Sequence, residues 1–254
     1  MTGTVVRKRF IAGNWKMNLD RASASALVAT LREHLASRSD VDVAVFPPFV
    51  YLQEVAQALA GSPIRVGGQN CCDQPVGAFT GEVSAKMLAD VGATLVIVGH
   101  SERRHVYGES DELVHAKVHA ALAAGLDVIL CVGETLAERE RAATEKVVGN
   151  QLRRGLEGVT ARDLPRLTIA YEPVWAIGTG LNATPEQASQ VHGYLRGVLT
   201  SLYDDRLAGG LRIQYGGSVK PSNVHALLSA PEVDGCLVGG ASIQAESFLS
   251  LVKP

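Results

Sequence analysis

The 254-residue sequence has few cysteines, few aromatic side chains and almost no net charge. Its four cysteines, Cys71, Cys72, Cys131 and Cys236, show neither CxxC spacing nor the paired spacing of a zinc site. They are too few and too unevenly placed for a disulfide framework, so we expect reduced thiols and a cytoplasmic protein. With a formal charge of −2, the chain gives no electrostatic reason to expect binding to nucleic acid or to a membrane surface.

Long apolar runs and linkers are also missing. No stretch approaches the roughly 18 consecutive apolar residues of a membrane span. The basic residues 7–9 imitate the start of a signal peptide, but Asn14 and Lys16 interrupt the apolar segment that follows. No Pro-rich or Gly/Ser-rich tract divides the chain. We therefore expect one domain over residues 1–254, with residues 1–6 as a short N-terminal extension.

What the sequence does contain is a regular series of short apolar, β-branched runs. They occur at residues 10–12, 41–46, 64–66, 94–98, 127–132, 167–171, 212–215 and 236–238. Apolar and polar residues do not alternate in them, which is typical of parallel strands covered on both faces. Segments with helical spacing separate the runs; in one of them Thr184, Pro185 and Gln187 predict a capping box and a helix reaching about Tyr203.

Eight strand–helix units of about 32 residues predict an α/β fold closed into a single (β/α)8 barrel. A doubly wound open sheet is the alternative, but it usually has fewer strands and would need edge strands with some exposed polarity. In a barrel, chemistry is expected where strands end. The polar residues at such ends are Asn14, Lys16, His100, Glu102 and Glu172.

Two of these residues have a position that distinguishes them from others of their type. Only His100 directly follows a strand and a glycine, and His105 falls in a loop. The other histidines fall in helical segments, where we expect them to be exposed to solvent: His34, His115, His119, His192 and His225. Glu172 ends an apolar strand and precedes proline, which restricts it to extended geometry. It suits a general base, with a structural ion pair as the alternative.

Glycine-rich turns follow the last two strands. Gly216, Gly217 and Ser218 form the first turn, and Gly239 and Gly240 the second. Residues without a Cβ let backbone N–H groups approach a ligand, and barrels commonly bind phosphate here. We therefore expect phosphate binding, with tight turns alone as the alternative. Residues 178–183 match GxGxxA, but they follow no strand end directly and the helix begins only at 184, so a dinucleotide site is not expected. A hinged lid fits better.

Other chemistries lack their motifs. The sequence holds no HExxH, no EF-hand loop and no GxSxG elbow. We therefore expect a site with no metal and no cofactor, in which a carboxylate base, an imidazole and a cation surround a phosphate-binding site. This set suits proton abstraction beside the carbonyl of a small phosphorylated sugar.

Six strings carry a family resemblance: FIAGNWKMN (10–18), GAFTGEVS (77–84), VGHSERR (98–104), YEPVWAIGTG (171–180), YGGSV (215–219) and LVGGAS (237–242). Together they resemble the triosephosphate isomerase family over roughly residues 7–252. The resemblance implies a TIM barrel that interconverts dihydroxyacetone phosphate and D-glyceraldehyde 3-phosphate in glycolysis and gluconeogenesis.

The family's roles can be carried onto matching positions of this sequence. The resemblance implies Glu172 as the base, His100 as a neutral electrophile, Lys16 as the stabilising cation and Asn14 as an orienting residue. It implies phosphate binding by backbone N–H groups of Gly178, Ser218, Gly239 and Gly240. Residues 173–183 would form a lid that excludes water.

The resemblance also implies supporting residues and a homodimer. Glu102 and Arg103 would support the site, with Arg103 paired to Glu82. Residues 69–81 would insert into a second copy of the chain, with Thr80 near the partner's site. Cys71-Cys72 and Pro75-Val76 depart there from the commonest family pattern, and Leu181-Asn182 replaces the Lys-Thr often found at the far end of the lid.

Two other functions stay open on sequence alone. A phosphate-binding barrel aldolase or synthase would need a Schiff-base lysine or a metal, and Lys16 is the only lysine at a predicted strand end. A barrel that binds a sugar phosphate without turnover is the other alternative, although all four catalytic positions are filled.

Overall fold

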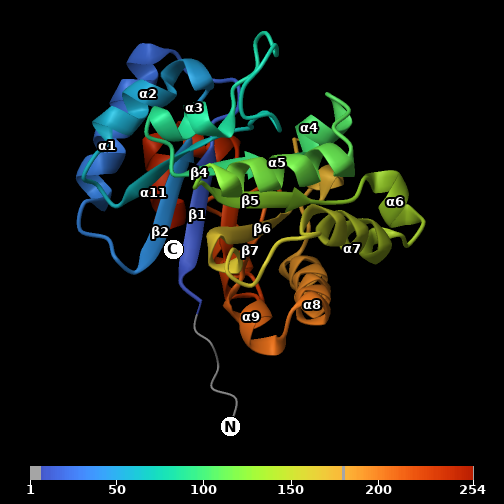
Figure 1. Ribbon diagram of the computed structural model, residues 1–254. Coiled ribbons are helices and arrows are strands. Elements are labelled where there is room, and N and C mark those ends of the chain that lie inside the picture. Colours follow the sequence, from blue (N-terminus) through green and yellow to red (C-terminus); the bar gives the residue numbers. More distant parts are fainter. Residues whose placement is uncertain (1–6, 179–180, 254) are drawn as a thin grey trace.

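The computed structural model describes residues 7–178 and 181–253, in which eight parallel strands close into a barrel (Figure 1). The strands are β1 (Arg9–Asn14), β2 (Val41–Phe46), β3 (Ile64–Gly68), β4 (Leu95–Val98), β5 (Asp127–Val132), β6 (Leu167–Tyr171), β7 (Arg212–Tyr215) and β8 (Gly235–Val238). Each strand pairs with its neighbour in chain order, and β1 pairs with β8 from Phe10 opposite Gly235. The predicted barrel is confirmed, and the open sheet is excluded; the expected extension at residues 1–6 lies outside the described residues.

Helices cover the outside of the barrel (Figure 1). They are α1 (Arg21–Leu35), α2 (Phe49–Ala58), α3 (Ala85–Asp90), α4 (Ser101–His105), α5 (Asp111–Ala123), α6 (Leu136–Glu140), α7 (Thr144–Gly155), α8 (Pro185–Leu202), α9 (Asp205–Gly210), α10 (Val224–Ser229) and α11 (Ala245–Val252), with the short turns η1 (Leu164–Arg166), η2 (Val174–Ala176) and η3 (Gly240–Ile243). The predicted capping box at Thr184 is confirmed, and α8 begins at the next residue. No helix in the described ranges has the length and apolar character needed to cross a membrane.

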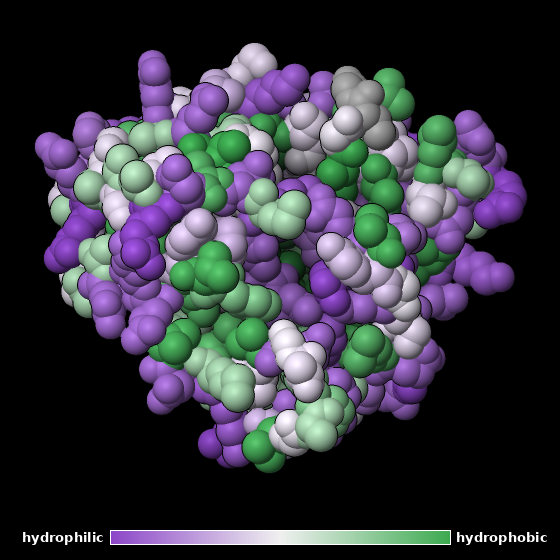
Figure 2. Space-filling model, turned by 90° about the horizontal axis from the view of Figure 1, so that it is seen from above, coloured by the Kyte–Doolittle hydropathy of each residue, from purple (hydrophilic) through white to green (hydrophobic). Residues whose placement is uncertain are grey.

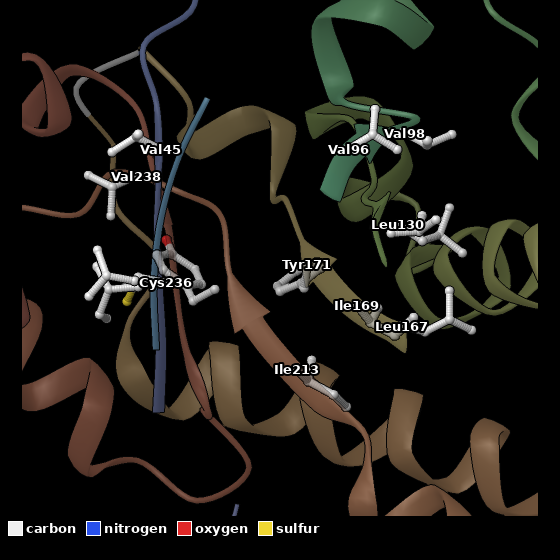
Figure 3. Close-up of a cluster of buried hydrophobic side chains, with 14 of the residues drawn as sticks. Val45, Val96, Val98, Leu130, Leu167, Ile169, Tyr171, Ile213, Cys236 and Val238 are labelled. Carbon is white, nitrogen blue, oxygen red and sulfur yellow. The ribbon is translucent and has the colours of Figure 1, made fainter. Parts of the chain in front are cut away.

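Two apolar layers explain why the strands do not alternate in polarity. Phe10, Ala12 and other residues of the inner cluster fill the barrel. Ile11 and its equivalents on other strands pack outward against the helices. Figure 3 shows part of this outer layer, including Ile169 and Ile213 from neighbouring strands. Since both faces of each strand are buried, both need apolar side chains.

The same alternation places polar residues in the mouth of the barrel. Ala12 and Ala170 belong to the inner cluster, so the inward positions two residues further along these strands are Asn14 and Glu172. Leu237 also belongs to the inner cluster, and Gly239 follows it by two residues. The parallel strands bring these ends to one rim, because they all finish on the same side of the barrel.

Candidate active site

A cavity of about 510 Å³ opens at the carboxyl ends of the strands. Seen from above, the surface is hollowed near its centre, and mostly hydrophilic residues border the hollow (Figure 2). Sequence-predicted residues that line the cavity are Asn14, Lys16, His100, Glu102, Glu172, Gly178, Ser218, Gly239 and Gly240. Residues from five different strand ends therefore meet around one space.

Glu172 is buried, with 2% of its surface exposed, and its carboxylate is held by two donors. The backbone N–H of Ser101 donates to Oε2 at 2.7 Å. His100 Nε2 lies 3.0 Å from Oε1. Gly216 packs against the same side chain, because a Cβ on this glycine would lie 2.7 Å from Glu172 Cγ. A carboxylate so fixed is positioned to accept a proton from a ligand in the cavity.

His100 is the N-cap of α4, and this position fixes its tautomer. Its Nδ1 accepts the backbone N–H of Glu102 at 3.2 Å. A nitrogen that accepts carries no proton, so the neutral ring has its proton on Nε2, the atom that faces Glu172. The imidazole therefore presents one N–H donor to the cavity.

Lys16 and Glu102 form an ion pair at the cavity wall, with Nζ 2.6 Å from Oε1. Burial opposes ionisation of Glu102, but the hydrogen bond and charge of Lys16 outweigh it and keep the pKa of that carboxyl below its ordinary value. Lys16 has a left-handed backbone, with φ of 52°, which is strained for a residue with a side chain. Asn14 Oδ1 accepts the Lys16 N–H at 3.0 Å, and Gln69 Nε2 donates to the Lys16 carbonyl at 2.8 Å.

The glycine-rich turns lie beside this lysine. A Cβ on Gly239 would lie 3.4 Å from Lys16 Cε, so the end of the Lys16 side chain runs along this turn. The N–H of Ser218 donates to the carbonyl of Ala176 at 3.2 Å, which links the turn to the segment after Glu172. This donor is therefore engaged within the chain in this conformation, and a ligand would have to compete for it.

The segment after Glu172 is anchored by a buried carboxylate that the sequence analysis missed. Glu134 Oε1 accepts from Trp175 Nε1 at 2.9 Å and from the Tyr171 hydroxyl at 3.1 Å. Arg139 pairs with the same carboxylate and stacks over the Trp175 ring at 4.6 Å. Glu134 follows β5 by two residues, so the rule that found Glu172 could have found it too. Within the predicted lid, residues 179–180 lie outside the described residues.

The structure corrects the predicted pairing of Arg103 with Glu82. Arg103 Nε donates instead to Glu109 Oε1 at 2.8 Å. The Lys117 ammonium contacts the same oxygen and also Asn70 Oδ1, at 2.9 Å. Lys117 is 3% exposed, so it is a buried cation that needs the Glu109 charge beside it. Glu82 is exposed and lies on a different segment.

Two histidine predictions are also wrong. His105 ends α4 and is not in a loop. His192 is fully buried rather than solvated, and its Nδ1 contacts the carbonyl of Glu232 at 2.8 Å. Burial, which disfavours the charged ring, lowers the pKa of His192 to about 4. The ring is therefore neutral near pH 7.

Residues 69–81 leave the barrel near the site as a projecting loop (Figure 1). Its tip is exposed and carries apolar side chains, with Val76 79% and Phe79 46% exposed. Thr80 is exposed as well. At the base of the loop Cys71 and Cys72 are buried free thiols, and burial raises the pKa of Cys71 to about 12. Among the described residues no group of three or more His, Cys, Asp or Glu side chains is arranged to hold a metal ion.

Comparisons with known proteins show what this chain is similar to. The family model described as Triosephosphate isomerase matches residues 9–254. A protein named Triosephosphate isomerase from Carboxydothermus hydrogenoformans is 54% identical over 248 residues, covering 98% of this chain and 99% of that protein. Proteins of the same name from Thiobacillus denitrificans and Syntrophotalea carbinolica are 53% and 50% identical, each over 98% of both chains.

Proposed function

Because the chain belongs to the triosephosphate isomerase family, we propose that it interconverts dihydroxyacetone phosphate and D-glyceraldehyde 3-phosphate with Glu172 as the base. The observation that carries this assignment is the buried Glu172 carboxylate with the Nε2–H of His100 at 3.0 Å. A base and an electrophile at this separation can act on adjacent carbons of one small substrate.

The proton transfer follows from the contacts of these two side chains. The substrate carbonyl oxygen takes the place of Glu172 Oε1 at His100 Nε2, and the carboxylate turns to the C–H bond beside the carbonyl. Glu172 removes the proton from C1, and the electron pair moves to the oxygen to give an enediolate. Lys16 and His100 stabilise the negative oxygen, while Asn14 holds the backbone of Lys16. A proton passes from O1 to O2, and return of the proton from Glu172 to C2 then leaves the carbonyl at C1, which completes the isomerisation with no cofactor.

The phosphate group is assigned to the glycine-rich turns of the cavity wall. Backbone N–H groups of Gly178, Ser218, Gly239 and Gly240 are the proposed donors, supported by their place in the cavity wall. Ser218 must release the Ala176 carbonyl to serve in this way. The segment 173–183 would then close over the substrate and exclude water, which protects the enediolate from loss of phosphate.

We further propose that the protein acts as a homodimer in which the loop 69–81 docks into a second copy. The exposed apolar side chains at the tip of this loop support the assignment, because water contact is unfavourable for them. Thr80 would then approach the partner's site. Size-exclusion chromatography with light scattering distinguishes this dimer from a monomer and from a tetramer.

The setting of the reaction follows from the same assignment. Interconversion of the two triose phosphates belongs to glycolysis and gluconeogenesis, so we place the protein in the cytoplasm. Its four buried free thiols suit a reducing compartment. We take residues 1–254 as one domain.

The assignment is tested by a coupled assay with dihydroxyacetone phosphate and the wild-type protein. The expected result is rapid formation of D-glyceraldehyde 3-phosphate without added metal or cofactor. Absence of turnover with retained phosphate binding would favour a non-catalytic sugar phosphate binder. Borohydride trapping of a covalent adduct at Lys16 would favour an aldolase and contradict the proposal.

A further inference from the structure

The charges around the cavity do not favour a phosphate ester unless one further residue contributes. The side chains that line it include two carboxylates, Glu102 and Glu172, and two ammonium groups, Lys16 and Lys220. Lys16 is committed to Glu102 at 2.6 Å, so this pair is close to neutral. Glu172 adds a negative charge, and the whole chain carries −2.

A triose phosphate adds to this difficulty because its phosphate is mostly a dianion near pH 7. Without Lys220, the charged side chains that line the cavity, Lys16, Glu102 and Glu172, would leave one negative charge uncompensated. Lys220 is exposed, and no carboxylate pairs with it among the residues that the structure describes. Of the two lysines that line the cavity, Lys220 is therefore the one whose charge is not neutralised by a carboxylate.

The backbone around Lys220 is held close to Ser218, one of the proposed phosphate donors. Asn223 Oδ1 accepts the Lys220 N–H at 2.8 Å. Asn223 Nδ2 donates to the Ser218 carbonyl at 3.0 Å. One amide side chain thus fixes both ends of the segment from Ser218 to Lys220, and Pro221 further restricts Lys220 to extended geometry. The backbone of Lys220 is therefore fixed beside the proposed phosphate-binding site, while its side chain stays flexible.

We propose that Lys220 is an electrostatic capture residue, which attracts the phosphate dianion to the mouth of the cavity and takes no part in proton transfer. The inference rests on the proposed function for the identity of the anion. An exposed, strongly hydrated ammonium acts through its field over several ångströms, and salt screens this field. Its effect belongs to substrate encounter, and hence to kcat/KM at low ionic strength.

The test is a charge series at one position, with Lys220→Arg, Lys220→Gln and Lys220→Glu. The matched control is Lys146→Gln, an exposed lysine on α7 that does not line the cavity. Activity is measured with dihydroxyacetone phosphate at ionic strengths from about 10 mM to about 300 mM, over which the Debye length falls from about 30 Å to less than 8 Å.

The expected loss of kcat/KM for Lys220→Gln is about 3- to 10-fold at the lowest ionic strength and less than about 2-fold at the highest. Lys220→Glu loses more, Lys220→Arg matches wild type, kcat stays within about 2-fold throughout, and Lys146→Gln is unchanged. If kcat/KM depends on ionic strength in the same way for Lys220→Gln as for Lys146→Gln, the inference is overturned. A loss that is independent of salt, or one that arginine does not restore, would also overturn it, since either indicates a direct contact.

Binding of inorganic phosphate, followed by NMR titration, separates this inference from the proposed function. If the wild-type protein shows no isomerase turnover, the proposed function fails, and the titration still decides the role of Lys220. Weaker phosphate binding by Lys220→Gln at low salt only, relative to Lys146→Gln, supports the capture role. Equal affinity in the two variants rejects it.

Discussion

His100 Nε2 lies 3.0 Å from Glu172 Oε1, although the two residues follow strands β4 and β6, which are separated by β5 in the barrel. The inward direction of both strand ends makes this contact possible. The proposed electrophile and the proposed base therefore contact each other, and a substrate oxygen must enter between them. Each side chain can be tested separately.

Replacing His100 by Gln should lower kcat by about 10²- to 10³-fold, because the amide is a poorer donor to the developing enediolate oxygen. KM should change much less, since the phosphate contacts are untouched. Steady-state kinetics with the coupled assay measure both quantities. His225→Gln, at an exposed position on α10, is the control and should match wild type. A kcat for His100→Gln within about 3-fold of wild type would contradict the assigned role.

Gly216→Ala tests the positioning of the base without changing any ionisable group. The new Cβ would lie 2.7 Å from Glu172 Cγ and 3.3 Å from the Tyr171 carbonyl, so the carboxylate must shift. A shift of this size should reduce kcat by about 10- to 100-fold while circular dichroism shows a folded barrel. Gly193→Ala is the matched control, because its Cβ meets no atom within 4 Å on an exposed part of α8. That control should keep full activity, and an equally active Gly216→Ala would show that the base tolerates displacement.

Glu109→Gln tests the buried network that replaced the expected Arg103–Glu82 pair. Removing the charge leaves the Lys117 ammonium, 3% exposed, without its carboxylate. The free energy of unfolding should fall by about 3–5 kcal/mol in urea titrations at fixed protein concentration. Adding Lys117→Met should recover part of that loss, because the unpaired buried charge disappears. A double variant that is as unstable as the sum of the two single variants would argue against a coupled pair.

His192 predicts a pH dependence of stability. Its pKa is about 4 when folded and 6.5 as an ordinary histidine, so the unfolded chain binds more protons between these values. Stability should therefore be unaffected by this group above pH 6.5, fall as the pH drops from 6.5 toward 4, and level off below. The maximum loss is about 3 kcal/mol. The ring packs against Tyr171, with Arg196 and the Glu232 backbone as its other neighbours.

His192→Asn checks this directly, because the Asn amide can donate to the Glu232 carbonyl as Nδ1 does but does not titrate. The free energy of unfolding, measured between pH 4.5 and 6.5, should have a smaller slope in His192→Asn than in wild type. His225→Asn, with an exposed histidine removed, should retain the wild-type slope. Equal slopes in all three proteins would place the pH dependence elsewhere.

Much of the barrel could be predicted because each strand carries its signal locally. The runs at 41–46, 127–132, 167–171 and 212–215 match the observed strands at both ends. β1 is longer than predicted, since Arg9 and Asn14 extend the pairing with β2 despite their polarity. α1 begins at Arg21, directly after Asp20, which forms a capping box with Ser23.

The sequence predicted which residues gather at the strand ends. It did not predict the burial and the contacts that depend on which face of a helix is covered. His192 lies on the buried stripe of α8 with Ala188 and Leu195, so its spacing already indicated burial. The network around Glu109 could not be read from sequence, because Glu109 pairs with both Arg103 and Lys117, and Lys117 contacts it only from α5. Glu134 was missed although it follows β5 by two residues, as Lys16 follows β1 and His100 follows β4.

The central claim is that Glu172 moves the proton, and the most direct measurement is turnover of dihydroxyacetone phosphate by Glu172→Gln. The amide keeps the size of the side chain but is not a base, so kcat should fall by about 10³-fold or more. Affinity for inorganic phosphate should stay within about 2-fold of wild type, and Glu33→Gln, at an exposed position on α1, should be fully active. A Glu172→Gln variant that turns over dihydroxyacetone phosphate at a rate within tenfold of wild type would contradict the account.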